Sequence, residues 1–394
     1  MALIVSFVFL AAMLFKRAGI GVTLVSTAIL MSLLSMELPQ VGEAWVQTTS
    51  DPVTVSLVLV TFGIMLLSLL YKETKAIEAL SESFGGLLKN SKLIVSALPA
   101  IMGLLPVPGG ALMSAPLVEK EAERLGLEED KKTYVNVWFR HIIFPVYPMS
   151  QILILTATLT QVSLTSIIIS QIPVVVAMAV VGYFVVLRTA RVNDEGVQMP
   201  RFRENLTSFL VSFSPILIMI LSVVIFRIDV AVSALVGIVT LIFITRPSLQ
   251  TLKKVISDFS IYKIALAAYG AMLLRNAIIF SGVSGILGQA VASSNLDEVV
   301  LLLALPATLG FIAGLPTVGI AISVPILAGS LTFTGSSASL LFMSAYLGYL
   351  AAPTHLCLAL TADYFKCSLN RAYKYLVPSL AASFAVALLA YYIL

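Results

Sequence analysis

Long apolar runs separated by short polar loops dominate the pattern along this 394-residue chain. A helix that crosses a membrane needs about 20 consecutive apolar residues. The pattern therefore predicts an all-α polytopic membrane protein. The expected transmembrane helices lie near residues 2–15, 18–36, 52–71, 135–160, 163–187, 207–226, 228–245, 262–282, 336–361 and 372–393.

Two further apolar segments, residues 93–118 and 299–330, contain too much proline and glycine for plain helices. The first includes LPAIMGLLPVPGGALMSAP, and the second includes LPATLGFIAGLPTVGIAISVP. Proline lacks an N–H donor and interrupts the helical hydrogen-bond ladder. We expect each segment to form a re-entrant helical hairpin. Interrupted segments at matching places in two halves of a membrane protein indicate a transporter's binding site.

The two hairpins belong to a longer internal repeat. FGIMLL from Phe62 matches YGAMLL from Tyr269, and the stretch that starts at Pro148 matches the stretch that starts at Pro353. Chance matching of apolar residues is the alternative explanation. The sequence predicts a first repeat over 1–190, a cytoplasmic linker over 191–206 and a second repeat over 207–394. Each repeat has five spans and one hairpin, and an odd number of spans inverts the second repeat relative to the first.

The distribution of basic residues supports this topology. With both hairpins re-entrant, all but three of the 24 lysines and arginines fall in loops on one side, the exceptions being Arg140, Arg227 and Arg275. Basic loops face the cytoplasm. We therefore expect a multi-pass protein of the cytoplasmic membrane with both termini outside. A residue composition that is 59% hydrophobic and 11% charged excludes an ordinary soluble protein.

The hairpin tips supply the first candidate substrate-binding residues. Glycine lets a ligand approach the backbone closely, and backbone groups at membrane depth must be buried or line a wet cavity. Some of the hydroxyls could instead bond their own helix backbone. The candidates at the two tips are Pro108, Gly109, Gly110, Ser114, Thr317, Gly319 and Ser323.

Prolines also interrupt two of the predicted spans. Pro145 and Pro148 lie in the span near 135–160, and Pro353 lies in its repeat counterpart. Thr156 and Thr361 follow these interruptions and join the candidate binding residues. Half-helix ends attract anions at the N-terminus and can hold Na⁺ at the C-terminus, although ordinary proline kinks are an alternative.

Charged residues within the spans point to an anionic ligand. Arg275, beside Asn276, and Arg140 fall inside predicted spans, where a charge costs several kcal/mol. Only one acidic residue, Asp363, lies at the end of a span, so an anion is an attractive counter-ion. His355 is a candidate proton-linked or substrate-binding residue. Arg140 could instead snorkel to the interface, and His355 could bond a broken helix.

The sequence contains no nucleotide-binding, catalytic or metal-binding motif. The two cysteines, Cys357 and Cys367, exclude a disulfide framework and are expected to be packing and surface residues. We expect no catalytic residue, no metal site and no cofactor, apart from Na⁺ or H⁺ as a coupling ion. The expected partners are a small anion, the lipid bilayer and a second copy of the chain, with no nucleic acid.

The motifs LPVPGGALMSAP and NVWFRHIIFPVYP resemble an uncharacterised prokaryotic family of integral membrane proteins, domain of unknown function 401, of the ion-transporter superfamily. Gluconate permeases and carriers of citrate, arsenite and dicarboxylates belong to that superfamily. The resemblance implies a dimeric secondary carrier with two opposed hairpins and an elevator mechanism. The Ser-Asn-Thr signature of the dicarboxylate carriers is missing here, so the resemblance does not assign a dicarboxylate substrate.

The sequence thus predicts a secondary active transporter of a small anion, such as an organic carboxylate, coupled to H⁺ or Na⁺. A cation/proton antiporter of the same fold is an alternative that would depend on Asp363. A membrane enzyme or lipid-handling protein is the alternative from a different class. The lack of clustered nucleophiles and bases argues against that second alternative.

Overall fold

Every regular element in the described part of the chain is a helix. The computed structural model describes the chain except residues 1, 17, 89, 106–109, 191–201, 284, 287, 288 and 290–295. The first half contains α1 (Ala2–Phe15), α2 (Ile20–Ser35), α3 (Leu38–Ser50), α4 (Pro52–Glu73), α5 (Ala76–Leu87), α6 (Ser91–Gly103), α7 (Ala111–Arg124), α8 (Glu129–His141), α9 (Gln151–Thr160), α10 (Leu164–Gly182) and the π-helical turn η1 (Tyr183–Leu187). The second half contains α11 (Phe202–Val224), α12 (Val230–Thr245), α13 (Leu249–Ile256), α14 (Phe259–Phe280), α16 (Glu298–Ala313), α17 (Pro316–Leu327), α18 (Gly335–Ala351), α19 (Leu356–Tyr364) and α20 (Leu369–Ile393).

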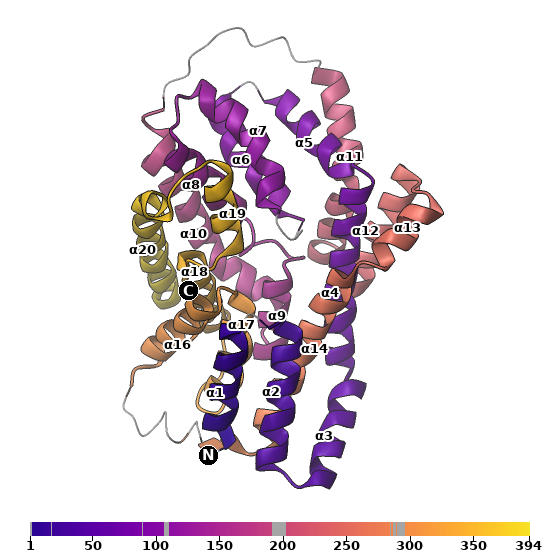
Figure 1. Ribbon diagram of the computed structural model, residues 1–394, viewed down its shortest axis with the longest axis vertical. Helices are drawn as coiled ribbons and strands as arrows, with labels where there is room; N and C mark the ends of the chain where they lie inside the picture. The colour runs from indigo at the N-terminus through magenta and orange to yellow at the C-terminus, as the bar shows by residue number, and fades with distance from the viewer. Residues whose placement is uncertain are drawn as a thin grey trace.

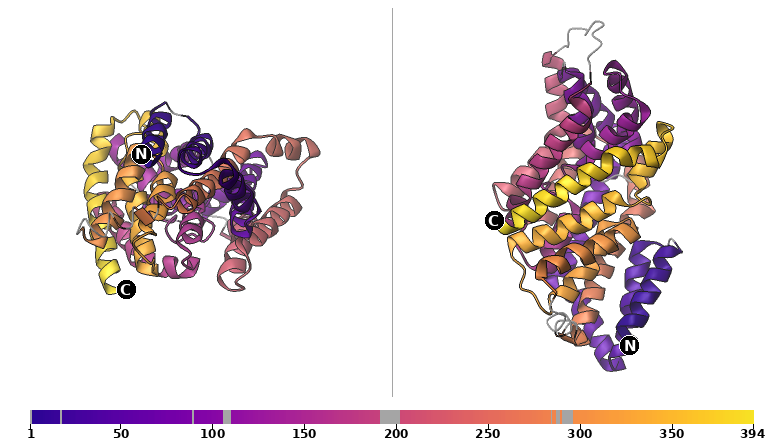
Figure 2. Two further views of the ribbon diagram at one scale, coloured as in Figure 1. Left: turned by 90° about the horizontal axis from the view of Figure 1, so that it is seen from below. Right: turned by 90° about the vertical axis from the view of Figure 1, so that its left-hand side faces the viewer.

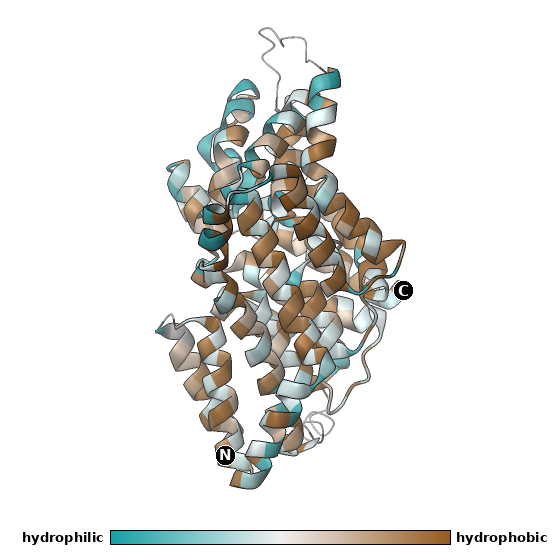
Figure 3. Ribbon diagram, turned by 90° about the vertical axis from the view of Figure 1, so that its right-hand side faces the viewer, coloured by the Kyte–Doolittle hydropathy of each residue, from teal (hydrophilic) through white to brown (hydrophobic). Residues whose placement is uncertain are grey.

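Among the described residues, six helical stretches are long and apolar enough to cross a membrane. They are Pro52–Glu73, Leu164–Leu187, Phe202–Val224, Leu249–Phe280, Gly335–Tyr364 and Leu369–Ile393. Apolar ribbon dominates the middle of the molecule, and polar residues gather toward its upper end (Figure 3). The predicted all-helical character is therefore confirmed, and the six apolar stretches are compatible with a polytopic membrane protein.

The helices form two bundles that lie side by side (Figure 1). In the first bundle α14 packs on α2 and α4, and α12 packs on α4 and α11. The second bundle contains α6 to α10 and α16 to α20. Viewed from below, α11 to α13 project on one side and the yellow helix α20 lies at the opposite edge (Figure 2). The bundles meet where α17 and α9 of the second contact α14 and α4 of the first.

Each of the two proline-rich segments folds into a pair of adjacent helices. Helices α6 and α7 replace the segment expected over 93–118, and α16 and α17 replace the one expected over 299–330. Each segment also keeps two prolines inside its helices, so those residues bend the chain without ending it. The actual interruptions lie between α6 and α7 and at Gly314–Leu315. The second helix of each hairpin packs on a helix from the other half of the chain. Helix α7 packs on α19, and α17 packs on α9.

Two equivalent glycines let each hairpin approach the neighbouring helix closely. A Cβ atom on Gly103 would collide with the carbonyl oxygen of Arg140, and one on Gly310 would collide with that of Ala345. The internal alignment pairs Gly103 with Gly310 within the shared LPA-x-x-G motif. Backbone-to-backbone packing of this kind is typical of helices in membranes.

Polar elements at the helix ends differ from the hydropathy pattern in two places. Residues 38–50 form helix α3, capped by reciprocal hydrogen bonds between Glu37 and Gln40, where we expected a loop. Helix α11 begins at Phe202, so the end of the predicted linker 191–206 is helical; residues 191–201 lie outside the described residues. Amphipathic α5 buries Ile77 and Leu80 and packs on α11, α6 and α4.

Candidate functional site

Two broken helices cross the second bundle, one from each half of the chain. Helix α8 stops at His141, and α9 starts only at Gln151, because Pro145 and Pro148 lie between them. Helix α18 stops at Ala351 for a similar reason. The next residue is held extended by the proline that follows it, with φ −67° and ψ 133°. Both interruptions predicted from the sequence are therefore present.

The tips of the two hairpins lie against these breaks. The described part of the first tip ends at Leu105, whose carbonyl oxygen accepts a 3.4 Å hydrogen bond from Nη2 of Arg140. At the second tip Gly314 adopts a left-handed φ of 63°, and a Cβ there would collide with the Thr354 hydroxyl. The first tip thus approaches the last turn of α8, and the second tip approaches the non-helical segment that follows α18.

Arg140 is the most deeply buried arginine of the candidate site. It is 3% exposed, and its Nη1 atom has no hydrogen-bond partner among the described residues. No carboxylate in the described ranges lies within ion-pair distance of it. A guanidinium carries five donors and a permanent charge, so the long bond to Leu105 and the contact with the neutral Cys357 thiol leave this group without a counter-charge.

The only two histidines of the chain lie beside Arg140 and face each other. The ring centroids of His141 and His355 are 4.8 Å apart with nearly perpendicular planes. Nδ1 of His141 lies 2.6 Å from the carbonyl oxygen of Val137. His355 is completely buried, and neither ring nitrogen has a hydrogen-bond partner in the described part of the chain.

Aromatic side chains of α18 enclose the two imidazoles. Tyr346 donates a 2.7 Å hydrogen bond to the carbonyl oxygen of His141. The ring of Tyr349 lies 4.2 Å from that of His355, and its hydroxyl is 3.4 Å from Nε2 of His141. These contacts bury both imidazoles, whereas Tyr349 itself is half-buried.

Cys357 completes the cluster from the first turn of α19. Its thiol lies beside the guanidinium of Arg140 and the backbone N–H of Ala111. One potential ligand atom from each of His141, His355 and Cys357 can be chosen so that all three lie within 4.8 Å of one another. Sequence analysis expected a packing role for this cysteine and no metal-ligating group here.

Asn136 joins two of the predicted site residues one turn before Arg140. Its Oδ1 accepts a 2.7 Å hydrogen bond from Ser114 of α7. Its Nδ2 donates to the carbonyl oxygen of Ala111 at 3.0 Å and to Oγ1 of Thr361 at 3.2 Å. All three side chains are buried, so this network fixes α7 and α19 against α8.

The equivalent positions of the second half carry less polar chemistry. Ser323 is buried and its hydroxyl has no partner among the described residues. The internal alignment pairs Asn136 with Leu341, which offers no hydrogen bond. Thr156 donates back to the carbonyl oxygen of Ile152 at 2.9 Å, a local bond that hydroxyl side chains often make in helices.

Two other candidates lie away from the tips where we expected them. Thr317 sits in the first turn of α17, and Gly319 lies within that helix, packed against the carbonyl oxygen of Pro306. Gly110 is buried at the start of α7. The predicted contacts of Pro108 and Gly109 lie outside the described residues.

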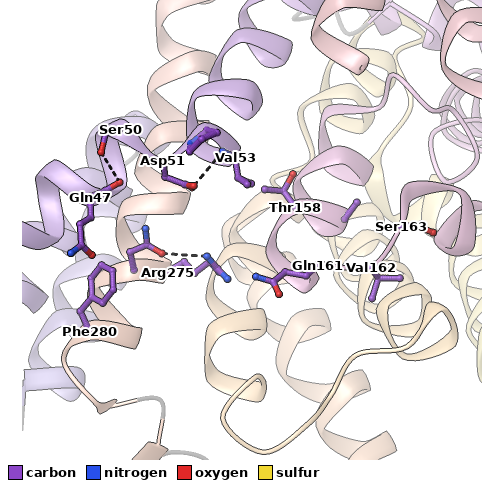
Figure 4. A pocket seen from close by; sticks show the side chains of 13 residues that line it. Gln47, Ser50, Asp51, Val53, Thr158, Gln161, Val162, Ser163, Arg275 and Phe280 are labelled. Atoms are coloured by element: carbon purple, nitrogen blue, oxygen red, sulfur yellow. Dashed lines mark hydrogen bonds between the residues drawn. The ribbon is translucent and has the colours of Figure 1, made fainter. Parts of the chain in front are cut away.

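Arg275 lies in a separate cavity of about 860 Å³ between the two bundles. Helix α14, the junction of α3 and α4 at Asp51, and the α9–α10 turn at Gln161 line this cavity (Figure 4). Nη1 of Arg275 makes a long, 3.3 Å bond to its neighbour Asn276. Asn276 also donates to Thr48 at 3.0 Å, so it serves partly to hold α3 against α14.

The structure therefore divides the predicted residues into two groups. Arg140, His355, Ser114 and Thr361 gather around the first hairpin and the two helix breaks, whereas Arg275 and Asn276 line the cavity. We expected neither Asn136 nor Cys357 in the first group, and we did not include His141 among the binding candidates. The spacing of Asn136 and Arg140 is one available signal, because residues four apart share a helix face.

The family model described as "Protein of unknown function (DUF401)" matches residues 1–394. The chain belongs to this family. The match covers both hairpins, both broken helices and the cavity-lining segments. A search of curated proteins found no match.

Proposed function

We propose that the protein is a secondary active transporter of a small anion, in particular an organic carboxylate, coupled to H⁺ or Na⁺. The observation that carries the proposal is the buried, poorly compensated guanidinium of Arg140. Removing such a charge from water costs several kcal/mol unless a counter-charge or hydrogen bonds offset the cost. A carboxylate would supply both, because it accepts two parallel bonds from a guanidinium.

The surroundings of Arg140 support the idea that a bound ligand, and not a permanent protein partner, supplies its negative counter-charge. Asn136 and Thr361 present further polar atoms one helical turn away, and the first hairpin ends beside them. Because the breaks leave backbone groups free of helical bonds, they offer additional donors and acceptors. Together these groups can hold a small polar solute in an otherwise apolar bundle.

The charge distribution argues against the antiporter alternative. Asp363 is exposed, so it does not provide the buried carboxylate that cation binding within the bundle would need. The two acidic residues that are buried in the described part of the chain are engaged near the polar helix ends. Glu121 accepts from Ser91 and pairs with Arg124, and Asp130 pairs with Arg371.

The arrangement of helices suggests how transport would occur. Equivalent glycine contacts, paired helix breaks and crossed hairpin packing support an inverted repeat with two re-entrant hairpins. The second bundle carries the polar cluster, and it lies against the first bundle, which does not. This arrangement suits an elevator-type movement of the second bundle against the first. On this proposal the chain is related to the ion-transporter superfamily, forms a homodimer and spans the cytoplasmic membrane with both termini outside.

Arg275 would act at an earlier stage than Arg140. It is half-buried in an open cavity between the bundles, with Asp51 nearby. A partly hydrated guanidinium attracts anions over a longer range but holds them less firmly than a buried one. We assign it to the access route and assign Arg140 to the binding site.

The test is thermal unfolding of the purified protein against a panel of carboxylates, oxyanions and neutral solutes, with and without Na⁺ and at two pH values. A solute at 100 times its dissociation constant should stabilise the folded state by about 2.7 kcal/mol. We expect a carboxylate to stabilise the wild type but not Arg140→Gln. The exposed Arg203→Gln variant is the matched control and should respond like the wild type.

Transport is then measured in proteoliposomes loaded with the stabilising solute. Counterflow of labelled carboxylate into vesicles that contain the wild type, and none with Arg140→Gln, is the expected result. If no anion stabilises the wild type, or if the neutralised variant still transports at the wild-type rate, the anion assignment is wrong.

A further inference from the structure

Both histidines of this 394-residue chain, and one of its two cysteines, meet in a single buried cluster. His141 ends α8, whereas His355 and Cys357 begin α19, so the cluster joins the first half of the chain to the second. The anion proposal requires neither the thiol nor a pair of imidazoles. Their convergence therefore calls for a separate explanation.

His141 is held in the orientation that metal-ligating histidines adopt. Its Nδ1 atom lies 2.6 Å from the Val137 carbonyl oxygen, which identifies Nδ1 as the protonated donor. The unprotonated Nε2 atom then faces the Tyr349 hydroxyl at 3.4 Å, and a cation would replace this long contact. A backbone carbonyl that fixes the tautomer in this way is the usual outer partner of a metal ligand.

His355 supplies the second observation that points to a ligand. It is completely buried, and neither ring nitrogen makes a well-formed hydrogen bond among the described residues, although the Leu350 carbonyl lies nearby. A buried polar group without a partner costs about 1–3 kcal/mol. Coordination to a cation would remove that cost for one of the two nitrogens.

Cys357 contributes the soft donor of the set. A cysteine binds metals as the thiolate, and the neighbouring Arg140 guanidinium would neutralise part of that negative charge. Two imidazoles and one thiolate favour Zn²⁺ or Cu⁺ over the hard cations Ca²⁺ and Mg²⁺, which prefer oxygen ligands. No carboxylate within the described segments approaches the cluster, which agrees with this preference.

We propose that His141, His355 and Cys357 bind one soft cation, Zn²⁺ or Cu⁺, that ties the α8 break to the start of α19. The potential ligand atoms lie within 4.8 Å of one another. Bond lengths of about 2.0 Å to nitrogen and 2.3 Å to sulfur require separations of about 3.3–3.6 Å. Small side-chain rotations close that difference, and the three protein ligands leave one coordination position open.

Cobalt(II) is the probe for the divalent form of this site, because it takes the place of Zn²⁺ and absorbs visible light. Titration of the purified, reduced wild type should yield one equivalent of Co²⁺ per chain and a thiolate-to-cobalt charge-transfer band. Zn²⁺ should displace it. A parallel anaerobic titration with Cu⁺ against a coloured chelator identifies the monovalent form.

The two cysteines provide a matched pair of variants. Cys357→Ser should abolish the charge-transfer band, whereas Cys367→Ser should leave it unchanged. Cys367 donates to the Ser368 carbonyl oxygen in the α19–α20 turn, and burial raises the pKa of its thiol. His355→Gln should weaken binding by about 10- to 100-fold or more, since loss of an outer partner alone has that effect.

Wild-type protein that takes up neither Co²⁺ nor Cu⁺ would overturn the proposal without any variant. A charge-transfer band that persists in Cys357→Ser, or disappears in Cys367→Ser, would also overturn it. Because stoichiometric uptake is measured on the wild type, a variant that fails to fold does not decide the outcome. Anion-dependent stabilisation of Cys357→Ser then tests the transport proposal independently.

Discussion

Replacing Arg140 with methionine should stabilise the ligand-free protein while abolishing its response to anions. Methionine keeps the length and apolar stem of the side chain but removes the charge and its donors. In the structure the guanidinium is 3% exposed, lies beside the neutral Cys357 thiol and makes a 3.4 Å bond to a carbonyl oxygen. A hydrogen bond of that length recovers little of the cost of desolvating a charge.

The expected size of this effect follows from comparable exchanges. Replacing buried ionic groups with apolar residues of similar volume is often neutral or stabilising, by about 1–4 kcal/mol. We therefore expect a higher midpoint of unfolding for Arg140→Met without ligand, together with no shift when the carboxylate is added. Such an exchange of stability for binding is characteristic of functional sites.

The assay is equilibrium unfolding of the purified protein in mixed micelles, with and without the stabilising carboxylate. Arg203→Met serves as the control, because substitutions at exposed positions remain within about 0.5 kcal/mol of the wild type. A loss of more than about 2 kcal/mol for Arg140→Met in the absence of ligand would refute the reasoning. It would mean that the protein itself compensates the charge.

Three further variants test other parts of the structure. Gly103→Ala should lower the free energy of unfolding by about 1–3 kcal/mol, because the added Cβ would collide with the Arg140 backbone. Gly42→Ala in α3 is the control: its Cβ would have no neighbour within 4 Å, so the substitution should be neutral or stabilising. Ser114→Ala should lower the free energy of unfolding by about 0.5–1.5 kcal/mol, because its hydrogen bond to Asn136 is lost. Ser323→Ala should leave that free energy unchanged, because the Ser323 hydroxyl has no described partner. Equal effects of the two substitutions would contradict this prediction. Arg275→Gln should leave the unfolding midpoint unchanged. It should raise the KM for anion uptake, and the increase should be largest at low ionic strength, where charges are screened least. An increase in KM that does not depend on salt would exclude electrostatic attraction as its cause.

Apolar periodicity and the positions of proline were sufficient to predict most of the architecture. Pro148 and Pro353 indicated both helix breaks, because proline acts locally on its own backbone and on the residue before it. Proline was less informative within the hairpins. Pro99 and Pro306 remain inside α6 and α16, where packing against a neighbouring helix keeps the chain helical.

The site itself was only partly predictable. Arg140 and His355 could be found because polar residues are rare in apolar spans, so each one is conspicuous in the sequence. Cys357 was missed because cysteine is common in apolar cores and reveals its role only through its neighbours. The meeting of α8 with α19 depends on tertiary packing between segments far apart in the chain, which no local pattern specifies.

The presence of only two histidines also makes this protein suitable for selective isotope labelling. Supplying ¹³C- and ¹⁵N-labelled histidine during expression would place labels at His141 and His355 alone. Both rings lie in the same cluster, 4.8 Å apart, so every labelled resonance would originate there. Magnetic resonance spectra of the unmodified protein would then report the tautomer of each ring, its response to anions and the arrival of a cation without any engineered tag.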